Sequence, residues 1–297
     1  MNKMRKQIIF FAISILLIIS GCTPFYQLVN ISPSSKLKKI SFSTTEANKT
    51  YYFYYSDTLN NNYLRELRQS YKLDSMTDNI NNEFEKIKII LDWTHLQWEH
   101  DGNNNPSKPD ALTILKEARS GKKFRCVEYG IVASSALNSI GITARVLGMK
   151  TRDVEKVRYG AGHVVSEVYS TSLNKWIFID PQFNVIPVLN RKPLNAVEFQ
   201  NAIVNDRNNL KLINLHGDLS TEDFNNYINW VAKYLFYFDV LFDQRKGNEP
   251  NYKDIDGMTK ITLVPVGEKE PKIFQRRSKI DFSFYTNSLN DFYRSPK

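Results

Sequence analysis

The stretch FRCVEYG, residues 124–130, opens a segment of small and aliphatic side chains that continues to Ile140 and stops at Gly141. Alanine, serine and glycine lie on most sides of a helix built from this segment, so we expect neighbours to pack closely all round it. Its first turn contains Cys126, one of 2 cysteines in 297 residues. The sequence therefore predicts a central buried helix with a thiol at its N-terminus.

Three extended segments follow this helix: the alternating residues 142–146, the run HVVSEVYS at 163–170 and the run WIFID at 176–180. Residues 172–175 form the turn between the last two, which predicts a hairpin. A hairpin centre between residues 171 and 173 pairs His163 with a position between 179 and 183. We therefore expect His163 and Asp180 to lie side by side at the open end of the hairpin.

These residues suit one kind of chemistry. A helix N-terminus presents unpaired amides and the positive end of the helix dipole, which favour a thiolate over a thiol. A nearby imidazolium adds to this effect, and a carboxylate behind the imidazole fixes its tautomer. Cys126, His163 and Asp180 thus occur in the order and setting of an activated nucleophile. Each alone has an ordinary explanation, as a small core residue, a structural histidine and a turn residue.

The runs GKKFRCVEYGIVASSALNSIGITARVLGM, GAGHVVSEVYS and KWIFIDPQFN, which together span residues 121–184, resemble the transglutaminase-like superfamily. The resemblance extends less strongly back to Tyr51. It implies an α+β, papain-like core in which a central helix packs on an antiparallel sheet. It also implies that Cys126 is the nucleophile, His163 the general base and acid, and Asp180 the orienting carboxylate.

The reaction that the resemblance implies acts on peptide or protein amides through a cysteine thioester, which water or an amine then resolves. Hydrolase and crosslinking transferase both remain open, and an amidase for cell-wall peptides would differ only in substrate. A catalytically inactive binding or scaffold protein with the same fold is the alternative. No cofactor and no metal are implied.

An oxyanion needs hydrogen-bond donors, and the backbone amide of Cys126 at the helix start is one candidate. By the resemblance, an upstream side chain supplies a second, and we favour Gln97 over Trp93 because apolar packing explains Trp93 equally well. Arg125 and Glu128 flank the thiol. They fit a solvated ion pair at the helix end as well as they fit a role toward substrate.

Residues 1–21 fit a lipoprotein signal peptide. The apolar run from Ile8 to Ile19 is too short to cross a bilayer, which takes about 20 helical residues. The sequence ISGC at 19–22 resembles a bacterial lipobox, so cleavage would leave Cys22 as a lipid-carrying first residue. An ordinary secretory signal with an incidental cysteine is the alternative. The expected location is outside the cytoplasm, anchored by lipid to the cell membrane or the outer membrane.

The composition is that of a globular protein, with 42% hydrophobic and 24% charged residues. The formal net charge is +9, part of which lies in the signal peptide. This balance suits an anionic surface such as lipid or cell wall, and nothing in the sequence indicates a nucleic-acid partner. With Cys22 lipidated, Cys126 would have no partner for an intramolecular disulfide.

The rest of the chain divides by composition. Residues 22–49 read as a tether and residues 50–216 as the catalytic domain, with helices expected from a Thr77 cap to residue 101, over 111–119 and over 193–204. Residues 217–297 form an accessory region, either a β-rich module or an extension of the sheet. Its aromatic run at 224–242 fits a helix or a buried strand, and its side chains fit the core better than a glycan- or peptide-binding surface.

Overall fold

The computed structural model describes residues 39–45, 51–56, 60–245 and 257–296. They belong to one compact unit, Leu37–Lys297. The expected signal peptide, Cys22 and most of the expected tether lie outside the described residues. In the ranges that the structure describes, no helix is both long and apolar enough to cross a bilayer.

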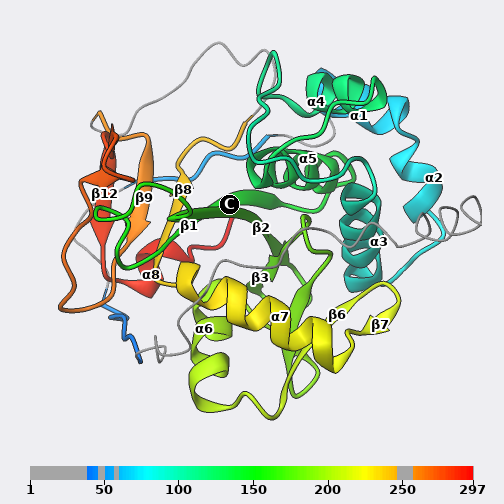
Figure 1. The fold of residues 1–297 in the computed structure, drawn as a ribbon. Coiled ribbons are helices and arrows are strands. Elements are labelled where there is room, and N and C mark those ends of the chain that lie inside the picture. Colours follow the sequence, from blue (N-terminus) through cyan, green and yellow to red (C-terminus); the bar gives the residue numbers. More distant parts are fainter. Residues whose placement is uncertain (1–38, 46–50, 57–59, 246–256, 297) are drawn as a thin grey trace, which may run out of the picture. The chain divides into compact units, whose positions relative to one another are not determined.

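A six-stranded sheet forms the centre of the fold, with strand order β12-β9-β8-β1-β2-β3 (Figure 1). Neighbouring strands are antiparallel except β12 and β9, which are parallel. The strands are β1 (Ala144–Lys150), β2 (Gly162–Ser170), β3 (Lys175–Ile179), β8 (Tyr237–Leu241), β9 (Lys260–Leu263) and β12 (Ser283–Thr286). The mixed helices and strands confirm the α+β class expected from the sequence.

In the described residues, five helices precede the sheet: α1 (Asn62–Ser70), α2 (Leu73–Thr77), α3 (Glu83–His95), α4 (Ala111–Arg119) and α5 (Cys126–Ser139). The bounds of α4 and α5 confirm the expected helices. Gly141 follows α5 with φ of 85°, a left-handed conformation that glycine adopts without strain.

Helix α3 is shorter than expected at both ends. Thr77 ends α2 instead of capping α3, and the side chain of Asn82 caps α3 by accepting hydrogen bonds from the backbone N–H groups of Phe84 and Glu85. The apolar residues keep helical spacing across the turn between α2 and α3, which explains the error.

Helix α5 packs against the sheet on one face of β2. A Cβ atom added at Gly130 would lie 3.0 Å from Cγ1 of Val164 and 3.1 Å from the carbonyl oxygen of Val165. The hydroxyl of Ser166 donates a 3.1 Å hydrogen bond to the carbonyl of Gly130. Glycine at position 130 thus lets the helix and strand backbones approach closely.

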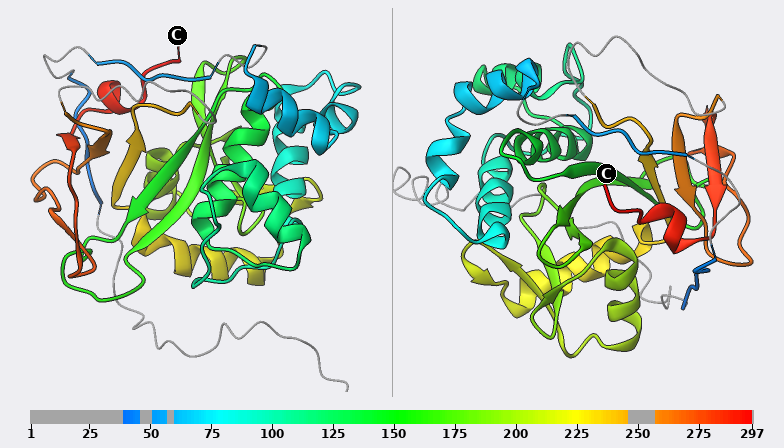
Figure 2. Two further views of the ribbon diagram at one scale, coloured as in Figure 1. Left: turned by 90° about the horizontal axis from the view of Figure 1, so that it is seen from above. Right: turned by 180° about the vertical axis from the view of Figure 1, so that it is seen from behind.

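The other face of the sheet is covered by residues that follow β3. Helices α6 (Ala196–Asn205) and α7 (Thr221–Val231) lie on the side of β1–β3 opposite α5 (Figure 1 and Figure 2). Val165 of β2 belongs to the apolar cluster that contains Phe199 of α6 and Ile228 of α7. The apolar cluster on the α5 side is formed with α3, α4 and α5.

The C-terminal region extends the sheet. β8 pairs with β1, and β9 and β12 continue from β8, so no boundary between compact units falls at residues 216 and 217. Of the two forms expected for residues 217–297, a β-rich module or an extension of the sheet, the structure shows the extension, because the chain returns to the same core. The aromatic run at 224–242 contains both expected elements, α7 followed by the short helix η1 (Ala232–Tyr234) and β8.

Two smaller sheets complete the fold. One contains β4 (Ile186–Leu189), β5 (Lys192–Pro193), β6 (Leu210–Asn214) and β7 (Gly217–Asp218), and the other contains β10 (Ile273–Phe274) and β11 (Ser278–Lys279). A last short helix, α8 (Leu289–Phe292), follows β12.

Part of the expected tether is ordered against the C-terminal residues. The N–H of Ser43 donates to Asn287 over 2.7 Å, and its carbonyl accepts from Leu289 over 2.7 Å. Phe42 packs against the cluster beside α6 and α7. Residues 42 and 43 of the expected tether therefore belong to the packed structure, because Phe42 supplies apolar area that its serine-rich surroundings concealed.

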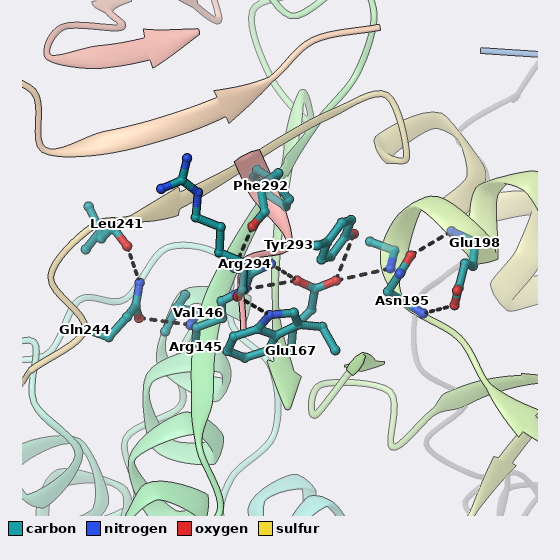
Figure 3. Close-up of polar contacts among 12 residues, drawn as sticks. Arg145, Val146, Glu167, Asn195, Glu198, Leu241, Gln244, Phe292, Tyr293 and Arg294 are labelled. Atoms are coloured by element: carbon teal, nitrogen blue, oxygen red, sulfur yellow. Dashed lines mark hydrogen bonds and ion pairs between the residues drawn. The ribbon is translucent and has the colours of Figure 1, made fainter. Parts of the chain in front are cut away.

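A buried ion pair between neighbouring strands links the sheet to the C-terminus (Figure 3). Nη2 of Arg145 lies 2.7 Å from Oε2 of Glu167, and both side chains are 0% exposed. The carbonyl of Phe292 accepts from Arg145, and the Tyr293 hydroxyl donates to Glu167. A buried ion pair needs such additional hydrogen bonds, so residues 292 and 293 complete this part of the core.

Candidate active site

Cys126 is the first residue of α5 and is partly exposed. Arg125 precedes it as the N-cap in an extended conformation, with φ of −82° and ψ of 176°. The thiol therefore lies in the first turn, where backbone N–H groups lack helical partners. This is the position expected from the sequence.

His163 lies near the start of β2 and is 2% exposed. Its Nε2 is 2.8 Å from Oδ2 of Asp180, and its ring lies near enough to Cys126 for the thiol to raise the pKa of the imidazole. Since Nε2 faces the carboxylate, Nδ1 is the nitrogen left for the thiol. The β2–β3 register, in which Ser166 pairs with Ile179, is the one that brings His163 and Asp180 together.

The protonation of His163 follows from its surroundings. Burial by itself lowers the pKa of the imidazole, but the charge of Asp180, the hydrogen bond to Asp180 and the interactions with Cys126 outweigh it and raise the pKa to about 9. At neutral pH the imidazolium is therefore the favoured form. An imidazolium beside a thiol stabilises the thiolate.

Four donors hold the buried carboxylate of Asp180. Oδ2 accepts from His163 and, over 2.8 Å, from the hydroxyl of Tyr227. Oδ1 accepts from the backbone N–H groups of Gln182 at 3.0 Å and Phe183 at 3.3 Å. These bonds leave the carboxylate little freedom to turn away from the imidazole, and they offset the unfavourable burial of its charge.

Aromatic residues from α7, η1 and the loop after β3 surround the imidazole. The ring of Trp230 meets that of His163 edge to face, with centroids 4.7 Å apart at 81°. Tyr234 and Phe183 lie at centroid distances of 5.8 Å and 6.1 Å. Burial and the charge of Cys126 raise the pKa of Tyr234 to about 12, so its hydroxyl stays protonated.

Sequence reasoning missed these aromatic neighbours of the site. Tyr227, Trp230 and Tyr234 recur at three- and four-residue spacing, which identifies one face of a helix. Their fit to the core was expected, and Tyr227 and Tyr234 are indeed buried. Nothing in the sequence, however, indicated that this face would meet a strand some 60 residues earlier in the chain.

The end of α3 supports the loop that follows Asp180. Nδ1 of His95 is 3.0 Å from the carbonyl oxygen of Gln182, and the amide of Asn184 donates to Asp92 over 2.7 Å. Helix α3 thus contributes to the site by positioning the residues that hold Asp180.

Gln97, the expected oxyanion donor, lies just beyond α3. Its Nε2 donates to the carbonyl of Trp93 over 2.7 Å, so one of its amide N–H groups is engaged. The segment that follows runs beside residue 124, because His100 forms a β-bridge with Phe124. The indole N–H of Trp98 is buried without a hydrogen-bond partner in the described residues. The ring itself packs in the core against Phe124 and Tyr129.

The structure distinguishes between the two roles expected for Arg125 and Glu128, a solvated ion pair and a role toward substrate. Glu128 is 1% exposed, whereas the Arg125 side chain is 32% exposed. The pair is therefore not a solvated ion pair. Glu128 faces inward at the helix start and accepts the N–H of Arg125 over 3.1 Å.

Comparison with known families agrees with this geometry. Residues 71–181 match the model of the transglutaminase-like superfamily. That range contains α3, α5, the strand that carries His163, and Asp180 directly after β3. This part of the chain is a transglutaminase-like core, as expected from its motifs. No curated protein matches the chain.

Solved structures resemble parts of the chain at low identity. A candidate cysteine protease from Cytophaga hutchinsonii is 17% identical, with a TM-score of 0.34, and the match covers 42% of this chain and 40% of that one. A TGase is 20% identical, with a TM-score of 0.29, and the match covers 40% of this chain and 30% of the other. A candidate protease from Parabacteroides distasonis is 16% identical, with a TM-score of 0.28, and the match covers 53% and 30%. This chain thus spans less than half the length of each.

Proposed function

We propose that this protein is a lipid-anchored thiol enzyme of the cell surface that acts on peptide or protein amides through a thioester at Cys126. The observation that carries the proposal is the position of His163, near enough to Cys126 for the thiol to raise its pKa and 2.8 Å from Asp180 on the other side. A buried core cysteine would need neither a charged imidazole nor a buried carboxylate, and burying those two charges is unfavourable unless they are paired.

The chemistry follows from the protonation states. The thiolate of Cys126 attacks the amide carbonyl, and the new C–S bond leaves the negative charge on oxygen, where the backbone N–H of Cys126 can stabilise it. His163 gives its proton to the departing amine as the C–N bond breaks. Water or an amine then attacks the thioester while His163 takes up a proton, and the thiolate is released. Water completes hydrolysis, and an amine completes transfer.

Asp180 supports both steps without reacting. It accepts from Nε2, keeps Nδ1 directed at the thiol and stabilises the imidazolium. The four donors on its own oxygens fix it in that role. The aromatic rings around His163 restrict access of water to the imidazole, which strengthens the electrostatic interactions within the site.

Alkylation by iodoacetamide tests the proposal directly. In the full chain purified in detergent, mass spectrometry of the peptide that contains Cys126 reports the labelling rate against pH. We expect fast labelling well below pH 8, since a thiolate reacts and an ordinary thiol has a pKa of about 8.5. Labelling that rises only above that pH would remove the basis for the enzyme and favour a binding or scaffold protein.

Turnover distinguishes the two reactions. Glutamine peptides would be offered with and without a labelled primary amine, so ammonia release alone indicates hydrolysis and label incorporation indicates transfer. Cys126→Ala should abolish both. An unchanged activity in that variant would contradict the proposal. For the anchor, Cys22→Ser should move the protein from the membrane to the soluble fraction, because lipid on that sulfur supplies the membrane affinity.

A further inference from the structure

The guanidinium of Arg125 is held rigidly next to the thiol. Its Nε donates to Oε2 of Glu128 over 3.2 Å and its Nη2 donates to Oε1 over 2.6 Å, a two-point contact with a carboxylate that also accepts the N–H of Arg125. Arg125 is the N-cap of α5 and Cys126 is the next residue. The guanidinium is therefore fixed at the entrance to the first turn.

The contacts engage only the inner edge of the guanidinium. Glu128 is buried and takes up Nε and Nη2, whereas Nη1 has no hydrogen-bond partner in the part of the chain that the structure describes. The Arg125 side chain is 32% exposed and Glu128 is 1% exposed, so the outer edge is the part of the guanidinium left to face solvent. A guanidinium that retains free donors is suited to a planar oxyanion, since its N–H groups match the geometry of a carboxylate.

Nearby acids do not compete for this edge. Glu99 forms its ion pair with Lys123, and Asp101 accepts from Asn103 and Asn104. Among the described residues, Glu128 is the acid that contacts Arg125, and its charge faces the interior. The pair therefore presents its positive end outward, next to the free N–H groups of the first helical turn.

We propose that Arg125 determines specificity by binding a carboxylate of the substrate next to the scissile amide. The preferred substrates are then peptides with an acidic side chain or a free chain terminus at that position. The inference rests on the proposed role of Cys126, because the thiol defines where the amide carbonyl must lie. Burial of Glu128 explains why the guanidinium is held in advance, which reduces the entropy lost on binding.

Two alkylating agents test the idea without knowledge of the substrate. Iodoacetate and iodoacetamide transfer similar groups to the thiolate and release iodide, but only iodoacetate carries a carboxylate. The ratio of their rates at Cys126 cancels any change in the fraction of thiolate. A role of Arg125 limited to stabilising the thiolate would slow both reagents equally and leave this ratio unchanged.

The variants are chosen to keep the fold intact. Arg125→Gln leaves Glu128 buried without its charge partner, so the double variant Arg125→Gln/Glu128→Gln serves as the second form. Lys233→Gln is the matched control, because Lys233 is an exposed cation over the ring of Tyr234, beside the same site. It removes one positive charge without touching the helix start.

We expect the rate ratio of iodoacetate to iodoacetamide to fall about fivefold in both Arg125 variants, the scale of one partly exposed ion pair, and to change little in Lys233→Gln. If the ratio is unchanged while the thiol stays reactive, the inference about Arg125 is overturned and the proposed function is not affected. An equal fall of the rate ratio in Lys233→Gln would contradict the inference, because it would show a general effect of nearby positive charge. A thiol that reacts with neither reagent would contradict the proposed function as well.

Peptides distinguish the two sources of carboxylate. Two pairs of peptides are compared. In the first pair both ends are blocked and the residue next to a glutamine is Glu or Gln; in the second pair the C-terminus is a free acid or an amide. The extent to which each peptide protects Cys126 against iodoacetamide measures its binding. We expect better protection by the acidic member of at least one pair, and loss of that preference in Arg125→Gln/Glu128→Gln. Equal protection by both members of both pairs would contradict the inference.

Discussion

The hydroxyl of Ser166 donates to the carbonyl of Gly130 over 3.1 Å, which joins β2 to α5 within about one turn of Cys126 and three residues of His163. The helix that carries the thiol and the strand that carries the imidazole are thus joined by a hydrogen bond at a position where their backbones approach closely. Small changes in this contact should move the Cys126 thiol and the His163 imidazole relative to each other.

Gly130→Ala tests this contact. A Cβ there would lie 3.0 Å from Val164 and 3.1 Å from a backbone oxygen, so α5 must shift away from β2. We expect a loss of about 1–3 kcal/mol in the free energy of unfolding by urea and slower alkylation of Cys126. Gly102→Ala is the control, since its nearest neighbour is 3.8 Å away, and it should leave both quantities nearly unchanged.

Asp180→Asn should lower the reactivity of the thiol without unfolding the protein. The amide keeps the volume but removes the charge that raises the pKa of His163, so the imidazolium should lose its proton at lower pH. We expect the alkylation rate of Cys126 near neutral pH to fall by at least about tenfold. A pH profile identical to that of the parent would contradict the role given to Asp180.

Tyr227→Phe tests whether the hydrogen bond that helps to hold the Asp180 carboxylate also controls the protonation of His163. It removes one of four donors to Asp180 and leaves the ring in place. We expect a loss of about 1 kcal/mol in the free energy of unfolding and a pH profile of alkylation close to that of the parent. A profile shifted as far as that of Asp180→Asn would show that one hydrogen bond controls the site.

The folded protein should become less stable as the medium becomes alkaline. The pKa of His163 is raised to about 9 in the folded state, and an unfolded histidine titrates near 6.5. Its contribution is complete below about pH 6.5 and is lost between there and about pH 9, up to roughly 3 kcal/mol. Urea unfolding at several pH values measures the loss, which should be much smaller in His163→Gln.

The buried ion pair gives a prediction about stability alone. Arg145→Met leaves Glu167 charged and uncompensated in the core and should lower the free energy of unfolding by about 3–5 kcal/mol. Arg145→Met/Glu167→Leu removes both charges and should recover part of that loss. Lys211→Met is the control, since its pair with Asp218 is 65% and 55% exposed and contributes little.

The sequence was sufficient to predict elements whose residues lie close together in the chain. A run of small residues predicted α5, and a turn of fixed length set the hairpin register that brings His163 to Asp180. Both depend on local spacing. The capping of α3 by Asn82 was missed because one polar residue inside a periodic segment gives a weak signal.

Long-range pairing was beyond reach of the same reasoning. Nothing in the run around Tyr237 indicates that β8 pairs with β1, nearly 90 residues earlier, so a separate C-terminal module and a sheet extension fitted equally well. The same limit hid Trp230 and Tyr227 from the site. The burial of charged side chains was not predicted either, because the sequence does not reveal that Glu128 and Glu167 face inward.

The contact of Phe292 and Tyr293 with the Arg145–Glu167 pair has a consequence for how the protein matures. During synthesis Arg145 and Glu167 are present long before the Phe292 carbonyl and the Tyr293 hydroxyl that complete their hydrogen bonds. The pair is then not yet fully hydrogen-bonded, so packing of residues 292 and 293 completes the core on the sheet. A variant truncated before Phe292 should accordingly be less stable and more readily degraded than the parent chain.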